Sequence, residues 1–591
     1  DDDADGLVDC ADPDCGGTCT ATPLGDEDCA NGADDDGDWL VDCGDDDCDP
    51  VCDADADTFV APAFGGDDCD DLDPDVHPGA VEVPYDGVDG DCDPTTPDDD
   101  LDADGFVAEA DCDDADAATF PGAPETCGDA AINDCDHPEL TPPRSACWGD
   151  RPAATADATL LGTSTDDWTA TAVAAAGDVD NDGYADLILG AYGQGNDATG
   201  AVYLVHGPVT GDLDLAQAAI KWTGESEDDW AGFAVAGGHD LTGDGHEDVV
   251  IGARYDDATG NSAGAVYVAR AIGEGTIELS LVTAKIYAEA EYDSCGYAVA
   301  SPGDIDGDGR ADLLLGSPEA SPAGNASGMA HAVYGPVDGA VQLSVATTRF
   351  VGEHELDKTG CAVAGVGDVD GDGQADLLVA ACFSDRNGED AGAAFQFSTH
   401  PAADLSVGDA DGAMVGERAF DQLGTALAGG DLDGDGLSDV IVGAPYHDVT
   451  ADDAGAVYAA FGPASVDMNR PDAKLTGVGA GDHLGASVAV AGDVDQDGFL
   501  DLVLGAPGHD GDDAEDAGAA YLVFGPILGT RSVADADVVV TGAAPFDFLG
   551  QSVAGAGDFD GDTFPDVVLG APFHDGLAPS SGAAYVFTFD W

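Results

Sequence analysis

The chain has 591 residues, of which 44% are apolar, so it can bury a packed core and can hold more than one domain. Its 123 acidic residues against 14 basic ones give a formal net charge of −109, which opposes a compact state unless cations bind or screen it. No stretch carries the Lys/Arg cluster that phosphate contacts require, which excludes nucleic acid as a partner and disfavours anionic membranes.

Residues 1–150 form a segment of their own, with 49 of the acids, 1 of the bases and 13 of the 16 cysteines. Such a density of cysteine indicates an oxidising compartment, as outside the cell. No apolar run approaches the ~18 to 20 residues of a transmembrane helix, so no membrane span is expected in this chain. Because the chain opens on Asp1 in mid-motif without a signal peptide, we expect that its true beginning has been removed or left out.

Aspartates in this segment alternate at a spacing that suits a metal-binding loop. The sets are Asp1, Asp3, Asp5, Asp9 and Asp34, Asp36, Asp38, Asp42. Interleaved with cysteines, this pattern resembles the metal-binding repeats of bacterial surface proteins and, more loosely, thrombospondin type 3 repeats. The resemblance implies a calcium-loaded ribbon stapled by disulfides. Zinc is the rival metal, but no C-x-x-C pair occurs and His77 and His137 are isolated.

After a linker expected at 151–156, residues 157–591 repeat the nine-residue motif D-x-D-x-D-G-x-x-D, or a close variant, seven times. The copies begin 62 to 65 residues apart, at Asp178, Asp240, Asp304, Asp368, Asp431, Asp493 and Asp558. Regular spacing at this scale indicates one structural unit per repeat. Each unit reads as four short strands; in the sixth they are 486–492, 500–507, 517–526 and 537–542. The sequence therefore predicts an all-β, seven-bladed β-propeller.

The ends of the repeat region predict how the ring closes. The last unit stops at its third strand, 581–591, so it lacks a fourth strand of its own. An extra strand, DATLLGT at 157–163, precedes the first unit and has the character of the fourth strands elsewhere. We expect this strand to complete the last blade.

The repeats resemble a known family. The stretch at 482–507 reads DHLGASVAVAGDVDQDGFLDLVLGAP, which is similar to the FG-GAP repeat of integrin α-chain propellers and their bacterial relatives. The resemblance covers about 435 residues. Three units depart from it: Ala170 replaces a Gly, 380–382 reads AAC instead of GAP, and Ser317 replaces the Ala of GAP.

Each motif offers alternating carboxylates, a Gly for a sharp turn, and an acid at position nine. Six to eight oxygens at flexible geometry suit calcium, whereas magnesium demands a tighter octahedron, so about seven Ca²⁺ ions are expected in the propeller and more are possible in residues 1–150. The candidate ligands are Asp178, Asp180, Asp182, Tyr184 and Asp186; Asp240, Thr242, Asp244 and Asp248; Asp304, Asp306, Asp308 and Asp312; Asp368, Asp370, Asp372, Gln374 and Asp376; Asp431, Asp433, Asp435 and Asp439; Asp493, Asp495, Asp497 and Asp501; and Asp558, Asp560, Asp562 and Asp566.

Two alternatives stay open for these loops and cysteines. Aspartate-glycine loops can be plain solvated turns, although seven copies that all keep the ninth acid argue against it. Two loops are weaker, because Thr242 removes a charge and Thr563 stands where Gly makes the turn. Cys361 and Cys382 lie close to opposite each other in the fourth unit, which predicts a disulfide; two buried free thiols are the alternative.

The predicted function is non-catalytic. His447, His509 and His574 each precede an Asp, but their recurrence in three blades favours a scaffold role, and no catalytic or cofactor-binding motif occurs. We interpret the chain as a calcium-binding adhesion or recognition protein, extracellular or at a bacterial cell surface as its resemblances imply, that presents one propeller face to a protein or glycan. By resemblance to integrins, that face is the rim opposite the calcium loops. The alternatives are a propeller-based hydrolase or lyase and a purely structural cell-surface protein.

Overall fold

The computed structural model describes residues 69–70, 73–78, 80, 92 and 150–589, except 283, 345–346, 399–403, 449, 463–470 and 512–513. The chain divides into two compact units, Asp1–Pro142 and Pro143–Trp591. Among the residues described, no helix has the length and apolar character needed to cross a membrane.

The described part of the first unit consists of turns around one disulfide. The N–H of Val76 donates to the carbonyl oxygen of Asp73, and Cys69 is bonded to Cys92. The predicted ligand sets from Asp1 to Asp42 lie outside the described residues.

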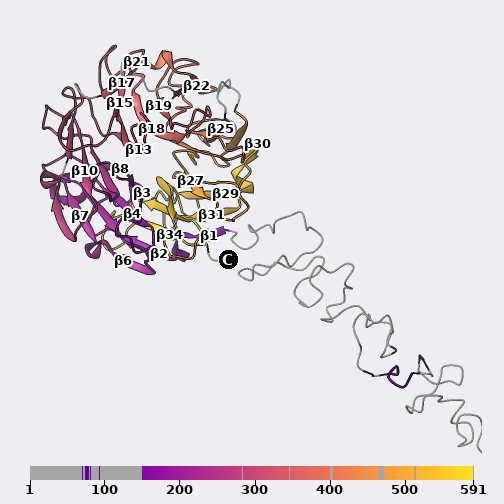
Figure 1. The fold of residues 1–591 in the computed structure, drawn as a ribbon. Helices are drawn as coiled ribbons and strands as arrows, with labels where there is room; N and C mark the ends of the chain where they lie inside the picture. The colour runs from indigo at the N-terminus through magenta and orange to yellow at the C-terminus, as the bar shows by residue number, and fades with distance from the viewer. Residues whose placement is uncertain are drawn as a thin grey trace, which may run out of the picture. The chain divides into compact units, whose positions relative to one another are not determined.

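The second unit is an all-β propeller of seven blades arranged around a central axis (Figure 1). The innermost, first strands are β3 (Ala172–Gly177), β8 (Ala231–His239), β13 (Ala298–Gly303), β18 (Thr359–Gly367), β23 (Leu427–Gly430), β27 (Ser487–Gly492) and β32 (Ser552–Gly557). The second strands are β4 (Asp186–Ala191), β9 (Asp248–Ala253), β14 (Asp312–Ser317), β19 (Asp376–Ala381), β24 (Asp439–Ala444), β28 (Asp501–Ala506) and β33 (Asp566–Ala571). Each second strand is buried along all six residues, as a strand packed on both faces must be.

The outer strands complete the antiparallel sheets. The third strands are β5 (Ala201–Val205), β10 (Ala265–Arg270), β15 (Met329–Val333), β20 (Ala393–Phe397), β25 (Ala456–Ala460), β29 (Ala519–Val523) and β34 (Ala583–Phe587). The fourth strands of blades one to six are β7 (Ile220–Thr223), β12 (Ala284–Tyr287), β17 (Thr347–Val351), β22 (Gly412–Val415), β26 (Ala473–Thr476) and β31 (Val538–Thr541).

The seventh blade takes its fourth strand from the other end of the propeller. β2 (Ala158–Leu161) pairs antiparallel with β34, with Leu160 opposite Ala584. Figure 1 shows β2, in purple, beside β34, in yellow. The N-terminal and C-terminal ends of the propeller thus share one sheet.

In the part of the chain that the structure describes, six blades also carry a fifth, outermost strand that the sequence did not predict. Each fifth strand lies in the chain segment that precedes the fourth strand of the following blade. It pairs parallel with the fourth strand of the blade that it completes. These strands are β11 (Gly275–Glu278), β16 (Gly339–Gln342), β21 (Leu405–Ser406), β30 (Gly529–Ser532), β1 (Asp150–Pro152) and β6 (Gly211–Asp214). Short helical turns follow five of them: η4 (Ala153–Thr155), η6 (Leu215–Gln217), η7 (Leu279–Leu281), η8 (Val407–Asp409) and η9 (Val533–Asp535). A further turn, η5 (Gln194–Ala198), lies between β4 and β5. Residues 151–155 of the expected linker 151–156 lie in β1 and η4.

The blades pack closely at the glycines of the repeat. A Cβ on Gly190 of β4 would come 2.1 Å from the carbonyl oxygen of Gly232 in the next blade. A Cβ on Gly505 would likewise come 1.9 Å from the carbonyl oxygen of Gly550 in the next blade. A side chain there would push neighbouring blades apart, which gives a physical reason for the Gly in GAP.

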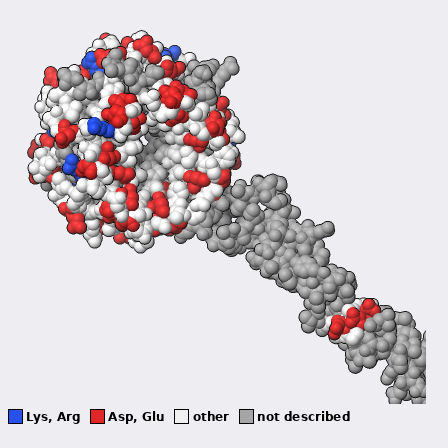
Figure 2. Space-filling view, in the orientation of Figure 1, with Lys and Arg blue, Asp and Glu red and all other residues white. Residues whose placement is uncertain are grey.

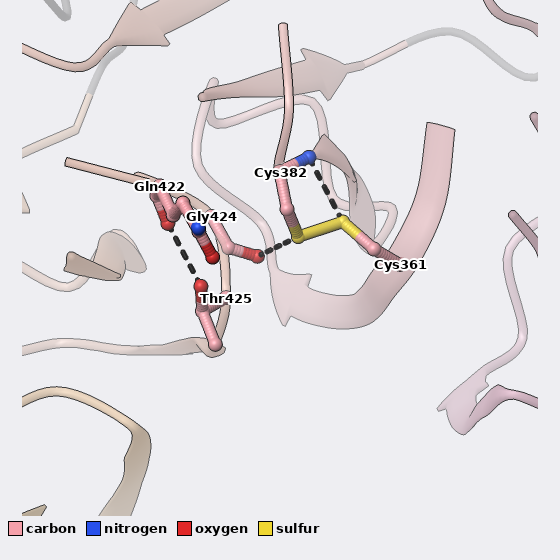
Figure 3. Close-up of a disulfide and its surroundings, with 5 residues drawn as sticks. All are labelled: Cys361, Cys382, Gln422, Gly424 and Thr425. Carbon is pink, nitrogen blue, oxygen red and sulfur yellow. Dashed lines mark hydrogen bonds between the residues drawn. A yellow bond between two sulfur atoms is a disulfide. The ribbon is translucent and has the colours of Figure 1, made fainter. Parts of the chain in front are cut away.

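The Cys361–Cys382 disulfide, predicted from strand register, is confirmed (Figure 3). It joins β18 to the residue that follows β19, with Cα atoms 6.2 Å apart. Sγ of Cys382 lies 3.3 Å from the carbonyl oxygen of Gly424, which leads into the next blade. The disulfide therefore staples the inner hairpin of the fourth blade at its contact with the fifth.

Candidate metal centres and the opposite rim

The strand directions define two rims. We call the ends where first strands turn into second strands the aspartate rim, because all seven predicted loops lie there. We call the other end the loop rim. It consists of the connections between second and third strands, and of those between each fourth strand and the next first strand. Figure 2 shows acidic side chains spread over the visible face of the propeller, around a hollow at its centre, with few Lys or Arg.

Backbone hydrogen bonds shape every aspartate loop in the same way. In all seven loops the N–H at position six donates to Oδ2 of the first aspartate, at 2.7 to 3.0 Å. The N–H at position two donates to Oδ2 of the ninth aspartate, at 2.7 to 2.9 Å. The loop is thus folded around its own carboxylates, which holds their remaining lone pairs in fixed places.

The predicted ligands converge, though not in one uniform set. Carboxylate oxygens of positions one, three and nine come together in the fourth and fifth loops. In the third loop positions one, three and five do so. In the first and fourth loops the N–H groups of Tyr184 and Gln374 donate to the position-five carboxylates at 3.0 and 2.8 Å. A metal-binding role for their carbonyl groups stays a prediction.

The position-nine aspartates are the buried side of each site. Oδ1 of Asp376 and Oδ1 of Asp566 are shielded from solvent and lack a hydrogen-bond partner. A buried charged oxygen without a partner is costly, and a cation would compensate it. The residues present therefore fit an oxygen-coordinated divalent cation, and the acidic clusters are compatible with such sites.

Burial also raises the pKa of these carboxyls, and the neighbouring loop carboxylates raise it further. The pKa of Asp312 is raised to about 6, that of Asp439 to about 7 and that of Asp501 to about 8. Both causes penalise the charged form, so a bound cation would favour ionisation of the same groups.

The second loop is partly neutralised by the protein itself. Nε of Arg270 lies 3.0 Å from Oδ2 of Asp244, and the N–H of Thr242 donates to Oδ2 of Asp248 at 2.8 Å. Thr242 was recognised as a weakness from the sequence. Arg270 was missed, because it lies at the end of a strand 26 positions further along the chain than Asp244.

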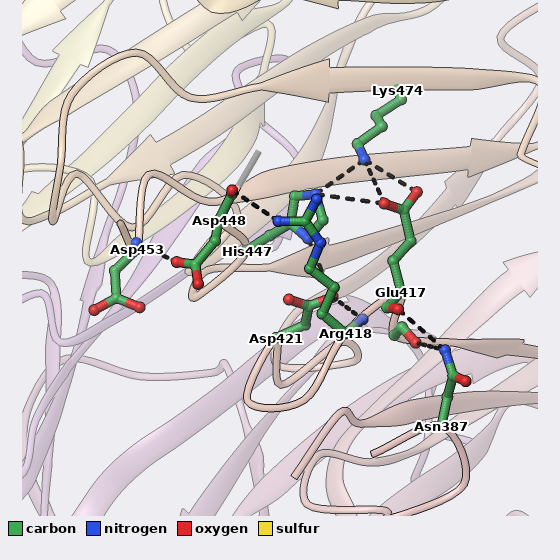
Figure 4. A network of polar contacts seen from close by, with 9 residues as sticks. Asn387, Glu417, Arg418, Asp421, His447, Asp448, Asp453 and Lys474 are labelled. Atoms are coloured by element: carbon green, nitrogen blue, oxygen red, sulfur yellow. Dashed lines mark hydrogen bonds and ion pairs between the residues drawn. The ribbon is translucent and has the colours of Figure 1, made fainter. Parts of the chain in front are cut away.

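The repeated histidines lie at the loop rim. The fully buried His447 accepts at Nε2 from the Nζ of Lys474 (3.0 Å), because an ammonium group can only donate (Figure 4). Its other nitrogen, Nδ1, therefore carries the proton and faces Oδ2 of Asp421 at 3.1 Å. His509 and His574 face Asp482 and Asp547 in the same manner, at 3.4 and 3.0 Å. In each of these blades, the contact joins the connection between the second and third strands to the turn that precedes the first strand.

The fold and these loops define a class, a β-propeller of acidic-loop repeats, and comparisons with known proteins identify the repeats. The FG-GAP repeat model matches residues 169–205, 423–459, 484–523 and 549–587, and the FG-GAP-like repeat model matches 240–315. A metal-binding motif model matches residues 68–98 and 111–137. The disulfide Cys69–Cys92 lies inside the first of these two matches. The chain thus carries FG-GAP repeats of an integrin-like propeller, and metal-binding motifs before them, as the sequence predicted.

Curated relatives point the same way. The chain is 37% identical over 160 residues to "Integrin alpha-7" of Homo sapiens, over 27% of this chain and 13% of that protein. It is 33% identical over 165 residues to "Integrin alpha-5" of Xenopus laevis (26% and 15%) and 30% identical over 169 residues to "Integrin alpha-PS2" of Drosophila melanogaster (27% and 12%). The chain thus matches less than a sixth of the length of these relatives. One solved structure, "Crystal structure of BBS1N in complex with ARL6DN, soaked with lead", is 11% identical over 74% of this chain and 98% of that chain, but its TM-score of 0.38 is too low to support an inference.

Proposed function

We propose that the protein is a non-catalytic, calcium-binding adhesion or recognition protein of a bacterial surface or its surroundings. Its aspartate rim binds Ca²⁺ through the predicted loop residues, and its loop rim presents the surface that contacts a protein or glycan ligand. The integrin-like repeats and the cysteine-rich segment support an extracellular or cell-surface location.

One observation carries the choice of rim. Eleven large apolar side chains are exposed in the described part of the chain, and eight of them lie on the loop rim. The eight are Tyr292, Leu356, Phe420, Tyr446, Val478, Phe546, Phe573 and Leu577. Exposed apolar side chains gathered on one face are typical of an interaction surface.

Backbone strain points to the same surface. Tyr292, Leu356 and Phe420 occupy the same register in three consecutive turns, are 51% to 56% exposed, and have φ of 68°, 69° and 70°. A bulky residue in the left-handed region is uncommon and costs about 1 to 3 kcal/mol. The other turns have positive φ at this register too, at Asp166, Asp228, Gly481 and Phe546, so a shared turn geometry holds these three apolar side chains out in solvent.

The loop rim also has a hollow of about 890 Å³ between these turns. Tyr292, Leu356, Arg254, Arg349 and Lys358 are among its lining residues. Three cations in one hollow are notable in a chain with only 14 basic residues, although Arg349 pairs with Glu289 and Lys358 with Glu319. The hollow adds polar contacts to the apolar turns, a mixture that suits protein recognition.

A row of aromatic rings on the loop rim is compatible with a glycan ligand. Rings of Trp168, Tyr192, Trp230 and Tyr255 follow one another along the loop rim with centroids 4.7 to 5.2 Å apart. All four side chains are half-buried, which leaves part of each ring in solvent. Partly exposed aromatic rings offer flat apolar faces for a ring-shaped ligand.

Binding to arrays of glycans and of extracellular proteins, with calcium and with chelator, tests this function. The variant with Tyr292→Ser, Leu356→Ser and Phe420→Ser should lose most binding while it keeps its melting temperature. The matched control replaces three exposed apolar residues away from the loop rim, Ile272, Leu281 and Leu528, by Ser and should bind normally. Equal binding by both variants would contradict the assignment of the rim.

The two alternatives predict other outcomes. A hydrolase or lyase would turn over a glycan or peptide substrate and would lose that activity on substitution of residues unique to one blade. A structural surface protein adapted to salt would be stabilised by sodium chloride even in excess calcium.

A further inference from the structure

The first aspartate loop differs from the others by a histidine. His206 follows β5, and Arg270, Tyr334, Ser398, Phe461, Phe524 and Thr588 occupy the same register in the other six blades. The first blade alone among the seven places an imidazole there.

The imidazole joins two of the predicted ligands. Nδ1 of His206 lies 3.2 Å from Oδ1 of Asp186 and 3.5 Å from Oδ2 of Asp180, and the three atoms belong to one compact group of possible metal ligands. Asp186 is fully buried. Nδ1 of His206 is shielded from solvent and faces both carboxylates, and Oδ1 of Asp186 also accepts a hydrogen bond from the N–H of Gly207 at 3.1 Å.

A second observation comes from the neighbouring blade. Oε2 of Glu247 is shielded from solvent and has no hydrogen-bond partner. It lies over Gly177, directly before the first loop, where an added Cβ would come within 1.6 Å of it. Among the residues that the structure describes, no Lys or Arg forms an ion pair with Asp180, Asp186 or Glu247. Burial raises the pKa of Glu247, and this carboxylate lies close enough to Asp178 and Asp186 for their charges to raise it further. His206 is the one ionisable base that faces Asp180 and Asp186 among the described residues.

The donor set discriminates between metals. Calcium takes oxygen ligands, whereas an imidazole nitrogen beside carboxylates suits Zn²⁺ and similar transition ions. Ligands at about 2.0 to 2.2 Å from a tetrahedral zinc ion lie roughly 3.3 to 3.6 Å from one another. The observed separations of 3.2 and 3.5 Å agree with that spacing.

We propose that Asp180, Asp186 and His206 bind one divalent transition ion of the Zn²⁺ class. The inference rests on the proposed cation-binding role of the aspartate loops but assigns a different ion to one of them. Its rival is a plain ion pair, as His574 forms with Asp547.

Cobalt substitution tests the site, because Co²⁺ reports its ligands through visible absorption. The full chain is saturated with Ca²⁺ and titrated with Co²⁺. His206→Phe introduces the residue that the fifth and sixth blades carry at this register, and His206→Gln keeps a polar side chain without the imidazole. Each variant should bind one Co²⁺ fewer than the wild-type chain and should lose the corresponding absorption band.

The control is His246→Gln, which removes an exposed histidine from the second aspartate loop and should leave Co²⁺ binding unchanged. If only one of the two His206 variants folds, that variant is enough to test the metal site. Equal Co²⁺ binding by the wild-type chain and a folded His206 variant would overturn the proposal in favour of the ion pair. A separate Ca²⁺ titration of the other loops distinguishes failure of this site from failure of the proposed calcium sites.

Discussion

The position-nine aspartates make the metal-free propeller sensitive to pH. Their folded-state pKa values, about 6 for Asp312 to about 8 for Asp501, lie above the ordinary value near 3.8. A raised pKa contributes stability that is complete below the unfolded-state value and is lost as the pH rises through the folded-state value. Metal-stripped protein should therefore lose stability between pH 5 and pH 8, as followed by thermal melting.

Calcium should abolish most of this dependence, because the cation favours the charged carboxylates. Asp501→Asn provides the control, since it removes one titrating group and keeps the side-chain shape. It should flatten the pH profile of the metal-free protein and weaken one calcium site. A metal-free melting temperature that stays level from pH 5 to pH 8 would contradict the assigned burial.

Thr563 makes the seventh loop strained. It has φ of 81° where six other loops have glycine, yet its N–H still donates to Oδ2 of Asp558 at 3.0 Å. A β-branched residue in this region costs about 1 to 3 kcal/mol. Thr563→Gly should therefore stabilise the calcium-loaded propeller by about 1 kcal/mol and tighten one calcium site.

The reverse exchange in the sixth loop is its control. Gly498 has φ of 94° at the same register, so Gly498→Thr should destabilise by a similar amount. Urea denaturation in excess calcium measures both. If Thr563→Gly did not stabilise the propeller and Gly498→Thr did not destabilise it, the loop backbone would relax around the side chain.

At the scale of single elements, the Cys361–Cys382 disulfide gives a measurable staple. It closes a loop with a sequence separation of 21, which in the chain-entropy account corresponds to about 3 kcal/mol. The double variant Cys361→Ser, Cys382→Ser should therefore melt lower than the wild-type chain. Cys295→Ser, at the buried free cysteine, tests the cost of a new buried hydroxyl without loss of a bridge. Mass spectrometry that finds Cys361 and Cys382 alkylated without reductant would refute the bridge.

The sequence predicted those elements whose signal is local. Aspartate loops, buried second strands and small first strands each carry their pattern within about ten residues, so seven blades could be counted. The fifth strands could not be found this way. β6 reads GDLD, a polar stretch typical of a turn, and it becomes a strand only because β2 offers a free edge beside it.

The same reason explains what was missed at the candidate sites. The predicted ligands follow one another in a nine-residue motif, whereas His206 and Glu247 reach the first loop from a later strand and from the next blade. The available signal was the register after each third strand, where one histidine replaces the hydrophobic, hydroxyl or arginine side chains of the other units. Such a signal becomes meaningful only when the fold shows what that register faces.

At the scale of the whole molecule, the segment before the first repeat serves two blades. β1, η4 and β2 reproduce the order of β6, η6 and β7, which follow the third strand of the first blade along the chain. β1 pairs parallel with β31 of the sixth blade, and β2 pairs with both β34 and β6. Residues 150–161 therefore replace the connection that would otherwise join the third and fourth strands of the seventh blade.

Stepwise removal of this segment tests the closure of the ring independently of any metal. A chain that begins at Ser164 lacks β1 and β2, so β34 and β6 lose their shared partner and the side chain of the fully buried Leu160 is gone. Loss of that side chain alone costs about 2 kcal/mol, and an open apolar edge invites association. This chain should melt well below one that begins at Pro143 and should form oligomers in light scattering. A chain that begins at Ala153 loses only β1 and its three pairs with β31, so its melting temperature should lie between the two. If all three chains melted alike and stayed monomeric, β2 would not be the strand that fastens the ring.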